Sequence, residues 1–319
     1  MAILETSDPL ANINFKCICE PCIIPNTKQV CTIANTRRFG ESLFIDGMLQ
    51  SSLSDEYIYH EMLVHSLLAG LRDKKNILII GGAEGCLLRE VLKWDSVEHV
   101  TQIDWDEGLI SYFKNDSEGV KWNSNAYDDP RVTLVHQDIV EWLEAQNNSI
   151  NPRVYNAIFV DLFDPDSSDS IGFLEIVCRQ SKKLLVPNGG LVLNSGPIGI
   201  TEGACTKLAV SLKNMFGEPC FERVAMKLSV PSFMGDWCIL LAVPKKWSTL
   251  LYETTLPPCL KRYSNQELHR CSSWSNDTPA EIRDFWKKSP SELENCPSRK
   301  LIPVGEDIYV SEYYNNYGC

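Results

Sequence analysis

The feature that most constrains the fold is an unbroken alternation of strand-like and helix-like runs between about residues 76 and 196. The first run, NILIIGG, is short, continuously apolar and ends in glycines, which is typical of a strand buried on both faces of a parallel sheet. The alternation predicts a doubly wound α/β domain. The expected strands cover residues 76–82, 99–104, 131–138, 155–161 and 191–196, and the expected helices cover 86–94, 108–116, 139–146 and 173–185, with a turn at 187–190.

Smaller elements are predicted before this region. Two β-rich runs, at residues 28–34 and 41–53, flank a stretch whose Asn, Thr and Gly suit a hairpin turn. They predict a small antiparallel β domain over roughly residues 20–54. The acidic residues in 54–56 then indicate the start of a helix that covers 57–71, because acids at a helix start complement its dipole.

The last third of the chain does not continue the alternation of strands and helices. Residues 220–230 and 236–244 predict two antiparallel strands, joined by a longer loop, at the edge of the sheet. The remainder is rich in Pro, Asn, Ser and Cys and predicts a surface segment with one or two short helices. Three segments are therefore expected: an N-terminal segment with the small β domain (1–54), the catalytic α/β domain (55–247) and a C-terminal extension packed on it (248–319).

Composition limits the possible environments and partners. Hydrophobic residues make up 44% and charged residues 23%, as in globular proteins with a substantial core. The sequence has no apolar run long enough for a membrane span and no signal peptide at its start, so we expect a cytoplasmic protein. The net charge of −12 repels nucleic acid and membrane surfaces, and neither is expected as a partner.

The odd number of cysteines, 13, favours free thiols in a reducing compartment. Cys17, Cys19, Cys22 and Cys31 could together supply four thiolates to a zinc ion. Their spacing differs from the paired Cys-x-x-Cys pattern of structural zinc sites, so zinc is the disfavoured alternative and we expect no metal.

The turn after the first strand, IIGGAEGC, is a candidate ligand loop. Gly81 and Gly82 let the backbone approach a ligand, and the helix that follows offers free amides. The loop lacks the Gly-x-Gly-x-x-Gly pattern, and no Lys-Ser/Thr pair follows it, so a pyrophosphate site is not expected. Glu84 would repel phosphate and attract a cation. The alternative is a glycine turn with an exposed glutamate.

Acidic residues follow each of the next three strands. Asp104 lies about 20 residues after the glycine loop, where a carboxylate can accept both hydroxyls of a ribose. Asp138 follows the third strand and could bind an adenine amino group; Asp161 and Asp164 follow the fourth. Because ligands bind at the carboxyl ends of parallel strands, these acids and Glu84 predict a cation-binding rim beside a nucleoside without phosphates, such as an adenosyl sulfonium. The alternative for each acid is a solvated strand end.

Five segments, in a fixed order, resemble one known family: RRFGESLFIDGMLQSSLSDEYIYHEMLVHSLL, IIGGAEGCLLREVL, DLFDP, NSGPIG and VPSFMGDW. Together they are similar to the polyamine aminopropyltransferases (spermidine synthases), and more closely to the thermospermine and spermine synthase branch. The similarity covers roughly residues 29–245, and LKRYSNQELHR resembles the C-terminal segment of the family.

The resemblance implies a methyltransferase-like α/β domain behind a small β domain, assembled as a homodimer or homotetramer. It implies decarboxylated S-adenosylmethionine as the aminopropyl donor, a polyamine as the acceptor and no metal. The residues implied for the donor are Gln50, Gly81, Gly82, Asp104 and Asp138 along its nucleoside, and Glu84 with Asp161 at its amino group. Those implied for catalysis and the acceptor are Asp161, helped by Tyr59, as the base, and His60, Asp164, Phe233 and Trp237 as acceptor contacts.

Several of these residues could instead have a purely structural role. His60 and His65 fall on one predicted helix, where a packed histidine is the commoner case, and Phe233 and Trp237 could serve packing alone. If they line a groove, they would cover the methylenes of the acceptor.

The expected reaction explains the acids. An amine with a pKa of about 10 is almost wholly protonated at neutral pH, so a carboxylate must capture the ammonium and then accept its proton. The leaving methylthioadenosine is neutral and needs no acid. Glu84 and Asp161 should also disfavour ordinary S-adenosylmethionine, because that molecule carries its own carboxylate.

Three positions depart from the family pattern. Ala83 stands where a third glycine is usual, Asn194 where the related branch has Gln, and Phe233 where many spermidine synthases have Tyr. The loop at 165–172 also differs. Two alternatives therefore remain: an S-adenosylmethionine-dependent N-methyltransferase, and a non-catalytic regulatory relative.

Overall fold

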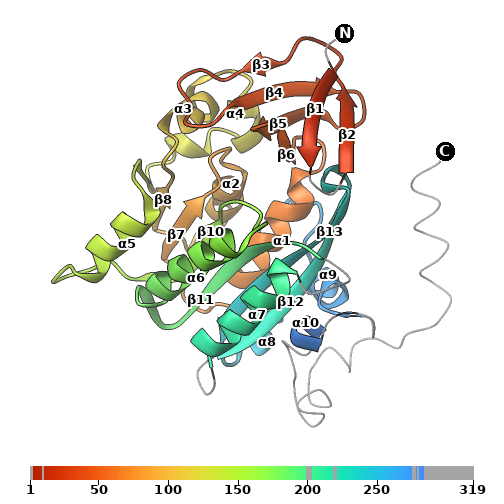
Figure 1. Cartoon of the computed structure of the whole chain (residues 1–319). Helices are drawn as coiled ribbons and strands as arrows, with labels where there is room; N and C mark the ends of the chain where they lie inside the picture. The colour runs from red at the N-terminus through yellow and green to blue at the C-terminus, as the bar shows by residue number, and fades with distance from the viewer. Residues whose placement is uncertain are drawn as a thin grey trace. The chain divides into compact units, whose positions relative to one another are not determined.

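The alternating region and the two strands that follow it fold into a seven-stranded sheet with the order β12-β13-β11-β10-β7-β8-β9 (Figure 1). This computed structural model describes residues 3–8, 11–198, 203–217, 221–274, 278 and 280–283. The strands are β7 (Asn76–Gly81), β8 (His99–Ile103), β9 (Val132–Val135), β10 (Tyr155–Asp161), β11 (Leu185–Pro197), β12 (Phe221–Val230) and β13 (Gly235–Pro244). The neighbours from β11 to β9 pair in parallel, while β13 pairs antiparallel with both β11 and β12. The predicted doubly wound α/β architecture is confirmed.

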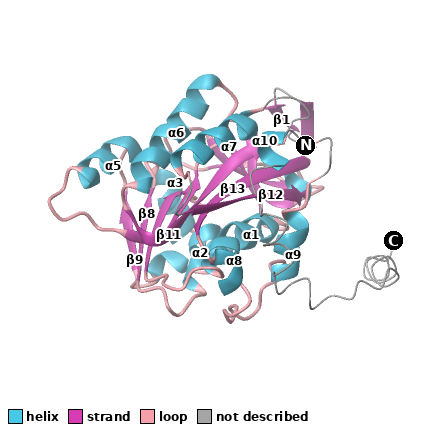
Figure 2. Ribbon diagram, turned by 90° about the horizontal axis from the view of Figure 1, so that it is seen from below, coloured by secondary structure: helices cyan, strands magenta, loops and turns pink. Residues whose placement is uncertain are grey.

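Helices cover both faces of this sheet (Figure 2). The longer helices are α1 (Glu56–Leu68), α2 (Cys86–Leu92), α3 (Glu107–Asn115), α5 (Ile139–Asn147), α6 (Ser168–Lys182), α7 (Ala204–Met215) and α9 (Asn265–Cys271), and the short ones are α4 (Val120–Asn123), η1 (Ala126–Asp128), α8 (Trp247–Leu250) and α10 (Ala280–Arg283). Alternate residues of β7 serve two separate cores, because successive side chains of a strand point to opposite faces. Ile77 and Ile79 pack in the core with α1, α2 and α3, whereas Leu78 and Ile80 pack in the core with α5, α6 and α7.

A four-stranded antiparallel sheet precedes α1. Its strands are β3 (Cys22–Ile23), β4 (Cys31–Thr36), β5 (Gly40–Ile45) and β6 (Met48–Ser52). The expected hairpin before residue 41 is present between β4 and β5. The run predicted as one element at 41–53 is instead two strands, because Asp46 and Gly47 adopt positive φ angles of 50° and 81° and reverse the chain. A separate two-stranded sheet comprises β1 (Ile3–Asp8) and β2 (Ala11–Lys16).

Several predicted boundaries in the α/β region are wrong, each for a local reason. Helix α6 begins before residue 173, because Ser167 and Ser170 form a reciprocal capping box. The turn expected at 187–190 lies inside β11, where the pairing with β10 is irregular. The longer loop expected between β12 and β13 is the short helical turn η2 (Pro231–Phe233). Helix α7 was not predicted.

The C-terminal part was predicted only in outline. Three helices of four to seven residues, α8, α9 and α10, follow β13 in the described part of the chain, against the one or two expected. Residues 284–319 of the predicted C-terminal extension lie outside the described residues. The described residues all belong to one compact unit, and the segment boundaries at residues 54 and 247 stay predictions. No described helix is both long and apolar enough to cross a bilayer.

Candidate active site

The site begins where β7 and β10 end side by side, with Gly81 paired to Asp161. The φ angle of Gly81 is 87°, and a Cβ at this position would lie 2.0 Å from the carbonyl oxygen of Asp161. Only glycine fits so close to the neighbouring backbone. The next amide, of Gly82, donates to the same carbonyl at 3.1 Å. The glycines therefore lock the ligand loop against the end of β10.

Asp161 is bonded to a tyrosine from a distant helix. The hydroxyl of Tyr59, on α1, donates to Asp161 Oδ1 at 2.6 Å, and the two residues are 4% and 9% exposed. A Cβ at Gly82 would lie only 3.6 Å from the other carboxylate oxygen, Oδ2. Burial and the nearby charge of Glu84 raise the pKa of Asp161 to about 6. This carboxylate can therefore change protonation state close to neutral pH.

His60, the next residue on α1, lies between two carboxylates. Its Nδ1 is 2.9 Å from Glu56 Oε2, and its Nε2 is 2.9 Å from Glu84 Oε1. Burial by itself lowers the pKa of His60, but the two carboxylates more than reverse this and raise it to about 10. These two carboxylates therefore favour the imidazolium form of the ring at neutral pH. Because both nitrogens already have partners, a direct contact between His60 and a substrate stays a prediction.

The second acid after β10, Asp164, is oriented by two donors. Its Oδ1 accepts from Asn194 Nδ2 and from Trp237 Nε1, each at 3.0 Å. The ring of Phe233 lies 4.9 Å from the ring of Trp237 and 5.6 Å from that of Tyr59. The rings of Phe233 and Trp237 therefore form an aromatic wall between the Tyr59–Asp161 pair and Asp164.

The turn that carries Phe233 is fixed to the start of α1. The backbone amide and the hydroxyl of Ser232 both donate to the buried carboxylate of Asp55 at 2.8 Å. Asp55 is the N-cap residue of α1, but its side chain makes no capping hydrogen bond. Its carboxylate thus links α1 to the aromatic wall.

The acids after β8 and β9 are held differently. Asp104 Oδ1 accepts from the backbone amide of Asp106 at 2.9 Å, and burial with the nearby charges of Asp106 and Glu84 raises the pKa of Asp104 to about 7. Asp138 is exposed and caps α5 by accepting from the amides of residues 140 and 141. Gln50 donates to the carbonyl of Met48. No hydrogen bond within the described residues joins these three side chains to Tyr59, His60, Glu84 or Asp161.

Sequence reasoning missed Gln102, which lies within β8. Its Nε2 donates to the carbonyls of Gly81 and Gly82, both at 2.9 Å. Its Oε1 is buried and has no hydrogen-bond partner among the described residues. The available signal was a long polar residue, Gln102, near the end of the strand that follows the glycine loop. A buried acceptor without a partner in the protein is costly, so this oxygen is a candidate ligand contact next to the loop.

The carbonyls of the ligand loop are held by residues from beyond α3. Tyr127 donates its hydroxyl to Ala83 O at 2.7 Å, and Asn123 donates to Glu84 O at 3.1 Å. Ala83 does not adopt a positive φ angle, so an alanine fits where the family usually has glycine. This departure from the family pattern leaves the loop geometry unstrained at that residue.

Two groups of side chains in the described part of the chain have the proximity needed to share a metal ion. They are Glu56, His60 and Cys86, and His60, Glu84 and Asp161, with ligand atoms within 4.8 Å of one another. The ion pairs of His60 already account for these short distances. The N-terminal cysteines Cys17, Cys19, Cys22 and Cys31 form no such group among the described residues.

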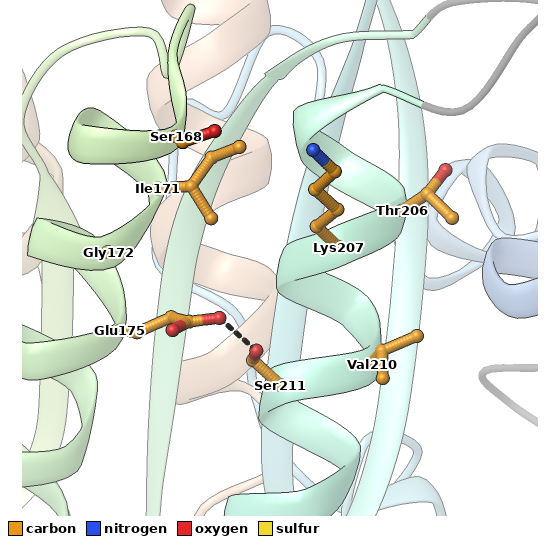
Figure 3. Close-up of a pocket in the computed structure, with 8 residues that line it drawn as sticks. All are labelled: Ser168, Ile171, Gly172, Glu175, Thr206, Lys207, Val210 and Ser211. Carbon is orange, nitrogen blue, oxygen red and sulfur yellow. Dashed lines mark hydrogen bonds between the residues drawn. The ribbon is translucent and has the colours of Figure 1, made fainter.

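A separate pocket lies between α6 and α7 (Figure 3). Glu175 and Ser211 are hydrogen-bonded across it, and Lys207 lies at its rim. The lining residues are Ser168, Ile171, Gly172, Glu175, Thr206, Lys207, Val210 and Ser211. No residue predicted for the active site lines this pocket.

The fold and the strand-end cluster define an α/β protein that holds buried carboxylates around a glycine loop. A family model described as the spermine/spermidine synthase domain matches residues 56–252. The chain belongs to the spermine/spermidine synthase family, which confirms the family that the motifs indicated.

Curated relatives and solved structures agree with this family. The chain is 38% identical to a polyamine aminopropyltransferase of Sulfolobus acidocaldarius over 66% of its own length and 67% of the relative's. It is 35% identical to another of Saccharolobus islandicus over 66% and 67% of the two lengths. The structure is similar to that of spermidine synthase from Thermotoga maritima, with a TM-score of 0.70, 20% identity and coverage of 88% and 93%. It is also similar to a spermidine synthase in complex with a transition-state analogue, AdoDATO. The TM-score is 0.73, the sequence identity is 20%, and the match covers 88% of this chain and 94% of the other. These structures share the fold.

Proposed function

We propose that this protein transfers the aminopropyl group of decarboxylated S-adenosylmethionine to a polyamine and releases methylthioadenosine. The observation that carries the proposal is the buried Tyr59–Asp161 pair beside the ion pair of His60 and Glu84. Similarity to the curated polyamine aminopropyltransferases supports the same reaction. The similar fold of a spermidine synthase solved with AdoDATO is consistent with it.

The donor's ammonium would lie between Glu84 and Asp161. Each of these carboxylates uses one oxygen for a hydrogen bond within the protein, to His60 and to Tyr59 respectively. Like charges about 4 Å apart repel by about 4 kcal/mol at the effective dielectric of a protein surface. The same two acids would therefore disfavour ordinary S-adenosylmethionine, whose carboxylate would approach them.

The donor's nucleoside would extend from Gly81 and Gly82 toward the ends of β8 and β9. The buried Oε1 of Gln102 offers an acceptor to a ribose hydroxyl, and Asp104 offers a second. Contacts of Asp138 with the adenine and of Gln50 with the nucleoside complete this half of the proposal. A sulfonium donor needs no metal for the displacement, and none is proposed.

Asp161 would act as the base. It must be ionised to accept a proton from the attacking amine, and a pKa of about 6 keeps it mostly ionised at neutral pH. Tyr59 orients it through the 2.6 Å hydrogen bond. Holding amine and methylene within about 3–3.5 Å of each other can lower the barrier by roughly 7–11 kcal/mol. Proton capture and alignment together account for the reaction without a covalent intermediate.

The acceptor would pass along the aromatic wall. Asp164 would bind a cationic nitrogen, and Phe233 and Trp237 would cover methylene groups. Because Phe233 lacks the hydroxyl of a tyrosine, we propose a longer acceptor such as spermidine, giving thermospermine or spermine. We further propose a cytoplasmic homodimer or homotetramer without nucleic acid or membrane partners.

Product analysis tests the reaction. Purified protein should release methylthioadenosine from decarboxylated S-adenosylmethionine with spermidine, and mass spectrometry should find an acceptor extended by one aminopropyl group. A panel of diamines and triamines identifies the preferred acceptor. Absence of methylthioadenosine across the whole panel would refute the proposal. Thermal stabilisation by ordinary S-adenosylmethionine alone would favour an N-methyltransferase, and stabilisation by neither donor would favour a regulatory relative.

A further inference from the structure

A line of charged side chains, with buried carboxylates and partly exposed cations, leads from the outside of α2 to the proposed donor pocket. Glu56 Oε2 accepts from His60 Nδ1 and from Arg89 Nη2, both at 2.9 Å. Arg89 Nε donates to Glu90 at 2.9 Å, and Lys93 lies 2.7 Å from the same carboxylate group. The side chains of Glu56 and Glu90 are 5% and 1% exposed. Positive and negative groups alternate along the whole line and end at Glu84.

Both ring nitrogens of His60 are held by hydrogen-bond partners, so its position depends on more than charge balance. The orientation of the ring is fixed from both sides. Nδ1 faces the carbonyl and the carboxylate of Glu56, and Nε2 faces Glu84. With both carboxylates ionised, this arrangement needs two N–H donors, so the ring carries a positive charge. Glu56 supplies the partner that keeps this charge buried, and Arg89 in turn balances Glu56.

We propose that Glu56 is a positioning residue for the donor pocket: it holds His60 as an imidazolium that orients Glu84 and offsets its charge next to Asp161. The inference rests on the proposed function, since Glu84 and Asp161 are there the ligands of the donor's ammonium. Among the side chains predicted to bind substrate, His60 is the one to which Glu56 is hydrogen-bonded within the described residues.

The charge of His60 also reaches Asp161. The groups that act on this carboxylate are Tyr59 and His60 from α1, Glu84 from the ligand loop and Asp164 from the end of β10. The two acids raise the pKa of Asp161, whereas the cation and the tyrosine hydroxyl lower it. Loss of the cation must therefore raise the pKa of Asp161 and move the onset of its base form to higher pH.

The experiment compares Glu56→Gln with Glu90→Gln in the full chain. Both substitutions remove a buried negative charge that pairs with Arg89, but only the first removes a partner of His60. Nitrogen-15 NMR of the imidazole rings reports protonation directly, and His60→Gln identifies the signal among the five histidines. We expect His60 to stay doubly protonated up to pH 8 in the wild type and in Glu90→Gln, and to lose its proton below pH 8 in Glu56→Gln.

Kinetics supply the second readout. In Glu56→Gln, kcat/KM for the donor should fall by about 100-fold, because displacing a substrate-binding group by about 1 Å can have an effect of this size. The acidic limb of the pH profile of kcat/KM should move to higher pH. The KM of the acceptor should change little. Glu56→Asp retains the charge and should keep the imidazolium, which provides a test if the glutamine variant does not fold.

The possible outcomes separate the two proposals. An unchanged His60 titration in Glu56→Gln, or an equal kinetic loss in Glu90→Gln, overturns the positioning role. A wild-type protein that releases no methylthioadenosine overturns the proposed function, while the NMR comparison still decides whether Glu56 holds the imidazolium.

Discussion

The acids at the ends of β7 and β10 and those at the ends of β8 and β9 occupy equivalent places in one sheet but are held in different ways. Asp161 and Glu84 are bonded by side chains of α1, which are 102 and 24 residues away along the chain. Asp104 and Asp138 accept from backbone amides only two or three residues further on. The first kind of bond requires the folded domain, whereas the second stabilises a local turn or a helix start.

This difference separates function from stability. A carboxylate that caps a helix contributes favourably to folding, so its presence at a strand end needs no ligand. A carboxylate that is buried among other acids opposes folding, because burial and repulsion both disfavour its charge. By this criterion Asp161 and Asp104 both belong to the second kind, since burial and nearby acids raise their pKa values to about 6 and about 7, whereas the exposed helix cap Asp138 belongs to the first. Such a residue is the better candidate for chemistry.

The largest expected effect is that of Asp161→Asn on turnover. An asparagine can still accept the hydrogen bond of Tyr59 but cannot take a proton, so kcat should fall by about 10²–10⁴-fold, the usual contribution of a general base. Single-turnover release of methylthioadenosine measures this loss. A rate close to that of the wild type would show that Asp161 is not the base.

The same substitution should increase stability at neutral pH. Because the folded-state pKa of Asp161, about 6, lies above the ordinary value of 3.8, its contribution to stability is fully present below pH 3.8 and is lost as the pH rises through about 6. Asparagine has no charge to bury, so Asp161→Asn should gain about 1–3 kcal/mol at pH 8 and nothing near pH 4. Denaturant unfolding at both pH values checks the sign; a loss of stability at pH 8 would contradict it.

Tyr59→Phe should have the next largest effect. The hydroxyl of Tyr59 orients Asp161 and lowers its pKa, so its removal should reduce kcat by about tenfold, equivalent to about 1.4 kcal/mol. In the wild type, kcat/KM should fall below about pH 6 as Asp161 gains a proton. In Tyr59→Phe this limb should lie at higher pH. An unchanged pH profile would indicate that the hydroxyl does not act on Asp161.

Ser232→Ala probes the link between α1 and the aromatic wall. The substitution removes one of the two hydrogen bonds to the buried Asp55, which should lower the free energy of unfolding by about 1.5–3 kcal/mol. Phe233 would lose part of its support, so the acceptor KM should rise severalfold while the donor KM stays unchanged. Ser232→Thr keeps the hydroxyl and is the matched control. A rise in the donor KM alone would place Phe233 outside the acceptor path.

The sequence predicted that Glu84 and Asp161 lie near each other, and the structure places them so, because this proximity follows from topology. Parallel strands bring their carboxyl ends to one edge, so Glu84 and Asp161 could be placed together from their positions alone. It could not predict Glu56 or Gln102. Glu56 has the appearance of an ordinary helix-start acid, and its pairing with His60 and Arg89 depends on how α1 packs on α2.

The same limit applies to the elements. Strands β7 and β10 are continuous apolar runs and were recognised directly, whereas the division of residues 41–53 into β5 and β6 depends on the backbone of a two-residue turn. The sequence carried an Asp-Gly signal at residues 46 and 47, which is typical of such hairpins. Helix α7 was missed altogether. Continuous periodicity was therefore a better guide than short turn signals in this chain.

The smallest expected effect, on Asp138, decides whether the comparison between the two regions holds. If Asp138 only caps α5, Asp138→Ala should lower the free energy of unfolding by about 1 kcal/mol, because the amides of residues 140 and 141 lose their acceptor. Asp138→Asn keeps a capping oxygen and should restore most of that stability.

The donor KM of this Asn variant then separates the capping role of Asp138 from a role in donor binding. If Asp138 also binds the adenine amino group, the stable Asn variant should still raise the donor KM by about tenfold or less, because a single hydrogen bond contributes about 0.5–1.5 kcal/mol. An Asn variant with the stability and donor KM of the wild type would make Asp138 purely structural and leave Asp104, Glu84 and Asp161 as the candidate functional carboxylates of the rim.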